Sequence, residues 1–142
     1  MNVAGEGLDR FLEAQASVYS EARAELAAAA KRTHWIWFIF PQLAGLGRTS
    51  TAKFYGIESR AEALAYWQHP VLGARLKECA ELVLAAPGGT TARGILGTPD
   101  DLKLRSCMTL FAAVAPDEAV FRDVLGRFYD GEPDEVTLRV LA

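Results

Sequence analysis

The sequence predicts an all-α fold, a single compact multihelical domain of about six to seven helices. Of the 142 residues, 24 are Ala and 17 are Leu, whereas 4 are Ile and 9 are Val. Ala and Leu are strong helix formers and β-branched residues favour strands, so this composition excludes an all-β sandwich or barrel and disfavours an α/β sheet. With 51% hydrophobic and 23% charged residues, the chain is expected to fold rather than to be disordered. Its length fits one domain over residues 1–142.

The first helix is predicted to run from Asp9, its N-cap, to about Ala30, because apolar residues such as Leu12 and Leu26 recur at helical spacing. Gln15 lies inside this apolar stripe. A buried amide without a partner costs about 1–3 kcal/mol. Gln15 therefore either bonds a nearby backbone group or faces a pocket.

An aromatic segment from Trp35 to Pro41 follows the first helix. Thr33 can cap a short helix that Pro41 ends. A buried strand is the alternative, because periodicity does not distinguish the two in so short a run. The helical surroundings favour the helix. The glycine-containing stretch 43–50 is predicted to be a loop.

Caps and prolines predict the remaining helices. Ser59 opens a capping box of the form Ser-x-x-Glu, which starts a helix that runs to about Gln68. The pair His69-Pro70 marks a break between two helices. Pro70 suits the first position of the second helix, which ends before Pro87. The later predicted elements are a short helical turn over 91–96, a helix with N-cap Thr98 that is apolar on nearly all sides over 102–115, a helix over about 117–128, and a helix from Asp134 to the end.

Charge and cysteine content exclude several classes of function. The chain has 15 basic and 18 acidic residues, a net charge of −3, which argues against a dedicated nucleic-acid binder. Cys79 and Cys107 lie apart, with no CxxC and no Cys/His cluster, so we expect reduced core cysteines, no metal site and no cofactor. The first 11 residues lack the features of a secretory signal, and the apolar run 35–41 is far shorter than the ~20 residues of a membrane span. We therefore expect a soluble cytoplasmic protein.

Residues 31–60 combine a net charge of +4 with the most aromatic part of the chain. Within them, the stretch Gly45–Ser50 partly resembles the end of a phosphate-binding loop, G-x-x-x-x-G-K-[ST]. However, Gln42 stands in the place of the first Gly and Arg48 in the place of the Lys, so a plain Gly-rich connection is the alternative. The backbone N–H groups of such a loop and the guanidinium of Arg48 suit a phosphate or a carboxylate.

Several further residues are candidates for catalysis or binding. His34 suits a general base at neutral pH or a hydrogen-bonded core residue, and Asp100 is the less favoured acid. His69 precedes a proline, where an imidazole often satisfies a group at a helix end. Asp100 and Lys103 either complement the helix dipole as an ion pair or cap a cleft together with Ser106.

Arg75 and the tryptophans have similar alternatives. Arg75 flanks the apolar face of its helix, where it either extends along that surface or binds an anion. Trp35 and Trp37 either anchor the core or stack on a ligand base.

The segment His34–Leu43, followed by Gly45-Leu46-Gly47, resembles the family catalogued as domain of unknown function 1810, some of whose members carry the label calpastatin. The resemblance implies a compact all-helical fold and no established activity. The calpastatin label implies protease inhibition, for which this helical sequence offers no reason, since a long disordered inhibitor would be polar and Pro-rich. The other matching residues follow in the same order over nearly the whole chain and are Phe11, Ala14, Gln15, Tyr19, Glu62, Ala63, Tyr66, 69–73, Arg75, Leu76, Gly97, Pro99, Asp100, Lys103, Leu104, Ser106, 108–111, Asp134, Thr137 and Leu138.

We therefore expect a helical domain that binds a small anionic ligand, a nucleotide or a phosphorylated metabolite, in a polar-lined pocket, with His34 as general base if a reaction is catalysed. The alternative is a protein-interaction module or homodimer that uses an exposed patch of Trp35, Trp37 and Tyr55. A third interpretation places both tryptophans in the core. The predicted ligand-binding residues are Gln15, Trp35, Gln42, Arg48, His69, Arg75 and Lys103, and the predicted catalytic residues are His34 and Asp100.

Overall fold

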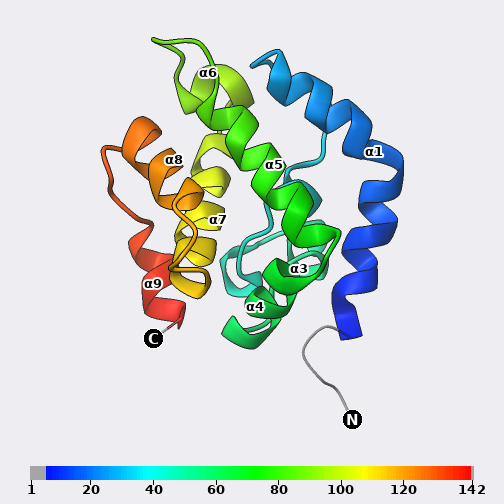
Figure 1. The fold of residues 1–142 in the computed structure, drawn as a ribbon. Coiled ribbons are helices and arrows are strands. Elements are labelled where there is room, and N and C mark those ends of the chain that lie inside the picture. Colours follow the sequence, from blue (N-terminus) through cyan, green and yellow to red (C-terminus); the bar gives the residue numbers. More distant parts are fainter. Residues whose placement is uncertain (1–5, 142) are drawn as a thin grey trace.

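The structure, a computed structural model, describes residues 6–141, which form nine α-helices, two 3₁₀ helices and no strand (Figure 1). The predicted all-α fold is confirmed. Residues 1–5, part of the segment compared with a secretory signal, lie outside the described residues. The longer helices are α1 (Asp9–Ala27), α4 (Arg60–Gln68), α5 (Leu72–Leu84), α7 (Asp100–Val114), α8 (Val120–Phe128) and α9 (Glu135–Leu141). The short elements are η1 (Glu6–Leu8), α2 (Ile36–Ile39), η2 (Ala44–Leu46), α3 (Ser50–Phe54) and α6 (Ala92–Leu96).

The aromatic segment after α1 is helical, but only over one turn. α2 covers Ile36–Ile39, so the strand alternative is wrong. The prediction that Thr33 caps this helix is also wrong, because its hydroxyl donates instead to Glu25 Oε2 at 2.8 Å. Trp35 occupies the N-cap position and makes no side-chain capping bond.

Other helix ends differ from the predicted ones by a few residues, as is common at helix ends. α1 ends at Ala27 rather than near residue 30. The capping box at Ser59 is confirmed by a bond of 3.1 Å from Glu62 N–H to Ser59 Oγ. α5 begins at Leu72 rather than at the preceding proline, and α7 begins at Asp100.

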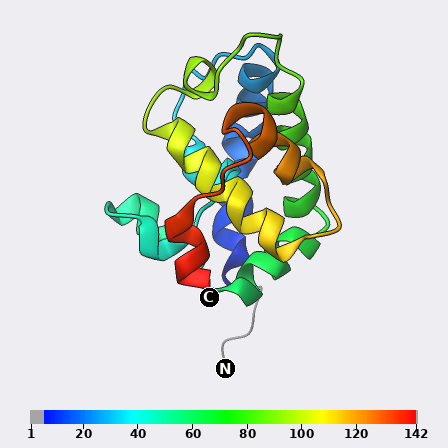
Figure 2. The ribbon, with the colours of Figure 1, turned by 90° about the vertical axis from the view of Figure 1, so that its left-hand side faces the viewer.

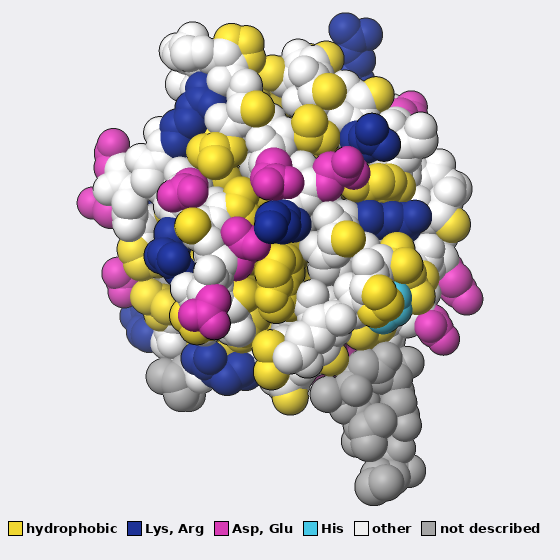
Figure 3. Space-filling view, in the orientation of Figure 1, with side chains coloured by type: hydrophobic (Ala, Val, Ile, Leu, Met, Phe, Trp, Pro, Cys, Tyr) yellow, Lys and Arg dark blue, Asp and Glu magenta, His cyan; other side chains and the backbone are white. Residues whose placement is uncertain are grey.

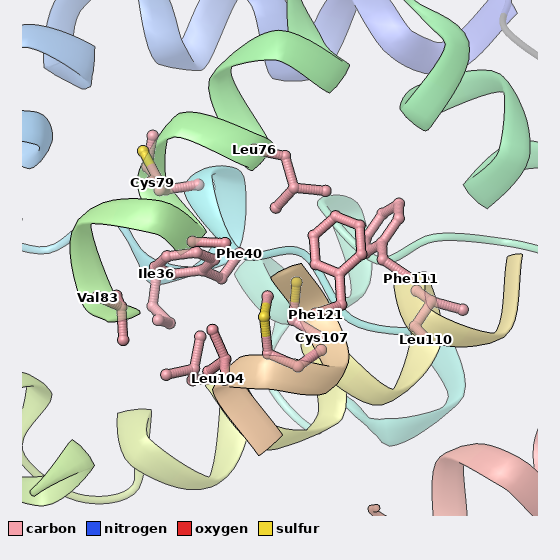
Figure 4. Close-up of a cluster of buried hydrophobic side chains, with 14 of the residues drawn as sticks. Ile36, Phe40, Leu76, Cys79, Val83, Leu104, Cys107, Leu110, Phe111 and Phe121 are labelled. Carbon is pink, nitrogen blue, oxygen red and sulfur yellow. The ribbon is translucent and has the colours of Figure 1, made fainter. Parts of the chain in front are cut away.

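α7 is the central helix, as its nearly continuous apolar sequence predicts. It packs against α4, α6, α8 and α9, and its residues Ser106–Phe111 are all buried. Side chains of α5 and α8, including Leu76 and Phe121, meet α7 in the core shown in Figure 4. Cys79 and Cys107 are free and buried there, and burial raises the pKa of the Cys79 thiol to about 12.

Residues 43–57 form a closed loop on one side of the core. Two backbone hydrogen bonds of 2.9 Å join its ends, from Ala44 N–H to the Ile57 carbonyl and from Ile57 N–H to the Gln42 carbonyl. η2 and α3 lie within this 43–57 loop and stand out beside α7 and α9 (Figure 2). Thr49 starts α3, because its hydroxyl oxygen accepts a hydrogen bond from Ala52 N–H at 3.0 Å.

The surface is of mixed character. On the face shown in Figure 3, basic, acidic and apolar side chains are interspersed rather than gathered by kind. None of the helices within residues 6–141 is both long enough and apolar enough to cross a membrane.

Candidate functional site

A groove of about 280 Å³ lies between the 43–57 loop and the start of α7. Three of the predicted ligand-binding residues, Gln42, Arg48 and Lys103, line it. We call it the Gln42–Lys103 groove. Its lining residues are Gln42, Leu46, Gly47, Arg48, Thr49, Ala52, Pro99 and Lys103. The fold thus brings polar residues from two distant parts of the sequence to one surface hollow.

A small recess of about 10 Å³ adjoins the groove and shares Gln42, Ala52 and Lys103 with it. Trp37 and Tyr55 also line this recess. The indole Nε1 of Trp37 is buried and has no hydrogen-bond partner among the described residues. An indole N–H can only donate, and a buried donor without an acceptor costs about 1–3 kcal/mol. A residue beside the groove therefore carries an unused hydrogen-bond donor.

The charged residues that line the groove, Arg48 and Lys103, are both basic. Lys103 Nζ lies 3.7 Å from Asp100 Oδ1, and Lys31 Nζ lies 3.0 Å from Asp100 Oδ2, so one carboxylate faces two ammonium groups. Arg48 is exposed and has no ion pair within residues 6–141. The two basic lining residues carry a charge of +2, and none of the described lining residues is acidic. Such an excess of positive charge favours an anionic ligand.

Gln15 and Arg75 belong to a different polar cluster and do not line the groove. Gln15 Nε2 donates to the Phe38 carbonyl at 2.6 Å and to Tyr66 Oη at 3.1 Å. Gln15 Oε1 accepts a hydrogen bond of 3.2 Å from Arg75, whose guanidinium also lies 4.5 Å from the centroid of the Tyr19 ring. The amide has partners at both ends, so it ties α1 to its neighbours inside the fold.

The two histidines lie outside the groove. His69 Nδ1 accepts hydrogen bonds from Val71 N–H at 3.1 Å and from Leu72 N–H at 3.2 Å, and it thereby caps the start of α5. His34 is exposed in the segment between α1 and α2. Within the described residues, Asp100 pairs with lysines and not with His34. The two predicted catalytic residues are therefore not brought together.

Trp35 is a core residue. Its side chain is 0% exposed, and its Nε1 donates to Glu25 Oε1 at 2.9 Å. Trp37 and Tyr55 are half-buried. The expected exposed patch of Trp35, Trp37 and Tyr55 is therefore wrong for Trp35, which has no surface to offer a ligand or a partner.

The groove also contains residues that the sequence does not single out as binding residues, namely Ala52 and Pro99. Small apolar and capping residues have ordinary roles in any loop, so their types carry no signal of a site. The positive charge of residues 31–60 is the available signal. This charge and the partial phosphate-loop pattern identify the loop side of the groove, and Lys103 is the residue that the sequence predicts on the α7 side.

Other surface hollows suit an anion less well. One of about 360 Å³, at the end of α4, has Asp117 and Glu118 as its charged lining residues. Another, of about 470 Å³, includes Arg10, but this guanidinium is paired with Glu62 at 2.8 Å. Within residues 6–141, no three His, Cys, Asp or Glu side chains gather in the manner of metal ligands.

Comparison with known proteins identifies the family. The model of the family described as "Protein of unknown function (DUF1810)" matches residues 5–141. The chain belongs to the DUF1810 family. This DUF1810 chain is similar to the conserved hypothetical protein Rv1873 from Mycobacterium tuberculosis, whose crystal structure superposes with a TM-score of 0.92 at 48% identity, over 94% of this chain and 95% of that chain. No curated protein matches this DUF1810 chain. Neither the family description nor the name of the similar structure states an activity.

Proposed function

We propose that this DUF1810 protein is a cytoplasmic protein that binds a small anionic ligand, a nucleotide or a phosphorylated metabolite, in the Gln42–Lys103 groove. The observation that carries the proposal is the convergence of Gln42, Arg48 and Lys103 on one groove whose charged lining residues are both basic. A guanidinium can hold a phosphate or carboxylate with two parallel hydrogen bonds, an ammonium adds a second cation, and an amide offers a neutral donor.

The ion pairs around Asp100 leave Lys103 available for such a ligand. The Lys103–Asp100 separation is 3.7 Å, so this partly exposed pair is weak, and moving Lys103 toward an anion costs little. Asp100 meanwhile keeps Lys31 at 3.0 Å and is not left unpaired. Arg48 has no described ion pair to give up.

Thermal unfolding in the presence of nucleotides, sugar phosphates and inorganic phosphate tests the proposal. A ligand at a concentration of 100 times its Kd stabilises the folded state by about 2.7 kcal/mol. We expect at least one of these anions to raise the Tm of the wild type, and Arg48→Gln and Lys103→Gln each to reduce this increase.

Matched controls remove the same charges elsewhere. Arg93 is exposed on α6, and Lys77 on α5 pairs with Glu118 at 3.0 Å. Neither residue lines the groove. Arg93→Gln and Lys77→Gln are expected to keep the full ligand-induced increase in Tm. A panel in which no anion stabilises the wild type, or in which the groove variants behave like these controls, contradicts the proposal.

A further inference from the structure

We infer that the ligand of the Gln42–Lys103 groove is a small phosphate monoester, bound as a dianion, and that Trp37 Nε1 supplies a third hydrogen-bond donor to it. This inference rests on the proposed function and narrows its ligand class, because it excludes the nucleotide. It follows from the size and lining of the groove, from its charge and from the unpaired indole.

The size and lining of the groove favour a short carbon skeleton over a nucleotide. Its volume of about 280 Å³ lies at the lower limit of ligand pockets, which span about 300–1,000 Å³. A nucleobase is held by stacking on an aromatic ring, and none of the groove's lining residues is aromatic. Trp37 and Tyr55 line the adjoining recess, but its volume of about 10 Å³ is too small for a nucleobase. The apolar part of the groove consists of Leu46, Ala52 and Pro99, which suit a chain of a few carbons.

The charge around the groove matches a phosphate monoester. The charged residues that line the groove, Arg48 and Lys103, carry +2. A phosphate monoester carries about −1.5 to −2 at pH 7, because its second pKa is about 6. A monocarboxylate would neutralise only half of this charge. No histidine lines the groove, so over pH 5–7.5 the ionisation of the ligand dominates any change in binding.

Trp37 lines the recess and carries the unpaired donor. A cavity of about 10 Å³ holds a single water-sized group, so one ligand oxygen fits there but a ring does not. The buried Nε1–H of Trp37 has no acceptor among the described residues. An oxygen of the bound phosphate ester supplies this acceptor, while the phosphate charge meets Arg48 and Lys103.

Isothermal titration calorimetry with four probes tests the ligand class: ribose 5-phosphate, AMP, adenosine and sulfate. At pH 7.5 we expect ribose 5-phosphate to bind at least tenfold more tightly than AMP, and adenosine not to bind. Because only about a tenth of a phosphate monoester is dianionic at pH 5.0, its affinity is expected to fall about tenfold from pH 7.5 to 5.0. Sulfate stays a dianion over this range, so its affinity is expected to stay constant and reports any titration of the protein.

The Trp37→Phe substitution tests the donor, because it keeps the ring and removes the N–H. We expect the affinity for ribose 5-phosphate to fall about tenfold. The matched control is Trp67→Phe, which is expected to leave the Kd unchanged. The Trp67 ring packs on Phe121, with 5.2 Å between the ring centroids, and does not line the groove. Equal affinity of wild type and Trp37→Phe overturns the role of Trp37.

The outcomes separate this inference from the proposed function. AMP that binds more tightly than ribose 5-phosphate, with dependence on Arg48 and Lys103, overturns the inference and leaves the proposed function standing. If none of the four probes binds, and no anion of the thermal unfolding panel binds either, both the inference and the proposed function are overturned.

Discussion

At the scale of single residues, the Glu25 carboxylate fixes the segment that joins α1 to α2. Its Oε1 accepts hydrogen bonds from Arg32 N–H at 2.8 Å, Thr33 N–H at 3.1 Å and Trp35 Nε1 at 2.9 Å. Its Oε2 accepts the Thr33 hydroxyl at 2.8 Å. Burial acts to raise the pKa of Glu25, but these donors, led by Arg32 N–H, outweigh burial and lower the pKa to about 2. The same segment carries Lys31, whose Nζ pairs with Asp100 Oδ2 at 3.0 Å.

The Glu25→Ala variant is expected to lower the free energy of unfolding by about 3 kcal/mol, because hydrogen bonds to a charged group contribute about 1.5–3 kcal/mol and Trp35 Nε1 would remain buried without an acceptor. Urea unfolding measures the change. The matched control is Glu21→Ala, one turn earlier on α1 and exposed, which is expected to change stability by less than about 0.5 kcal/mol. Equal effects of the two variants would contradict the role assigned to Glu25.

The contrast between Gln15 and Gln42 shows what the sequence predicts about the site. Both are polar residues in apolar surroundings, and this signal alone marks both as candidates. Gln15 proves to bond the Phe38 carbonyl and Tyr66, whereas Gln42 lines the groove. A sequence shows that a polar group needs a partner, but the partner lies far along the chain, so the tertiary fold decides between a structural and a ligand-facing role.

At the scale of elements, the 43–57 loop depends on a close approach of its two ends. A Cβ at Gly56 would lie 2.3 Å from Ala44 Cα, which no side chain tolerates. Arg10 of α1 also holds this end of the loop, since its Nε donates to the Phe54 carbonyl and its Nη2 to the Gly56 carbonyl, both at 2.8 Å. The loop wall of the groove is therefore set by contacts outside the groove.

The Gly56→Ala variant is expected to force the ends of this loop apart, to lower the free energy of unfolding by about 1–3 kcal/mol and to weaken binding of ribose 5-phosphate. Urea unfolding and calorimetry measure the two effects. Gly45→Ala is the matched control, because a Cβ there has no neighbour within 4 Å, and it is expected to change neither quantity. If Gly56→Ala binds the sugar phosphate as the wild type does, the loop wall does not depend on this contact.

The sequence predicts long elements better than short ones. α7 is identified by its caps and its apolar length, whereas α3 lies in a stretch predicted partly as loop. Five residues are too few for a periodic pattern, and a helix this short depends on tertiary contacts such as those of Arg10 rather than on its own propensity. The groove wall formed by α3 was therefore beyond prediction from local pattern.

At the scale of the whole molecule, the net charge conceals the local charge. The chain carries −3 in total, yet the charged residues that line the groove, Arg48 and Lys103, carry +2. The total charge argues against a polyanionic partner such as nucleic acid, because many phosphates would meet a negative molecule. A compact anion meets only the local cations, so the overall charge and the proposed ligand are compatible.

The whole fold is expected to lose stability as the pH falls from about 4.5 to 2. Folding lowers the pKa of Glu25 from its ordinary value of 4.5 to about 2, and the hydrogen bond from Lys77 likewise lowers the pKa of Glu118. In this window the unfolded chain binds more protons than the folded one, so the stabilisation is fully present above pH 4.5 and is lost below it. Urea unfolding at pH 6.5 and 3.0 measures the loss. Because glutamine does not titrate, Glu25→Gln starts less stable than the wild type but is expected to lose less stability between these pH values; an equal loss in both proteins would show that Glu25 does not govern acid unfolding.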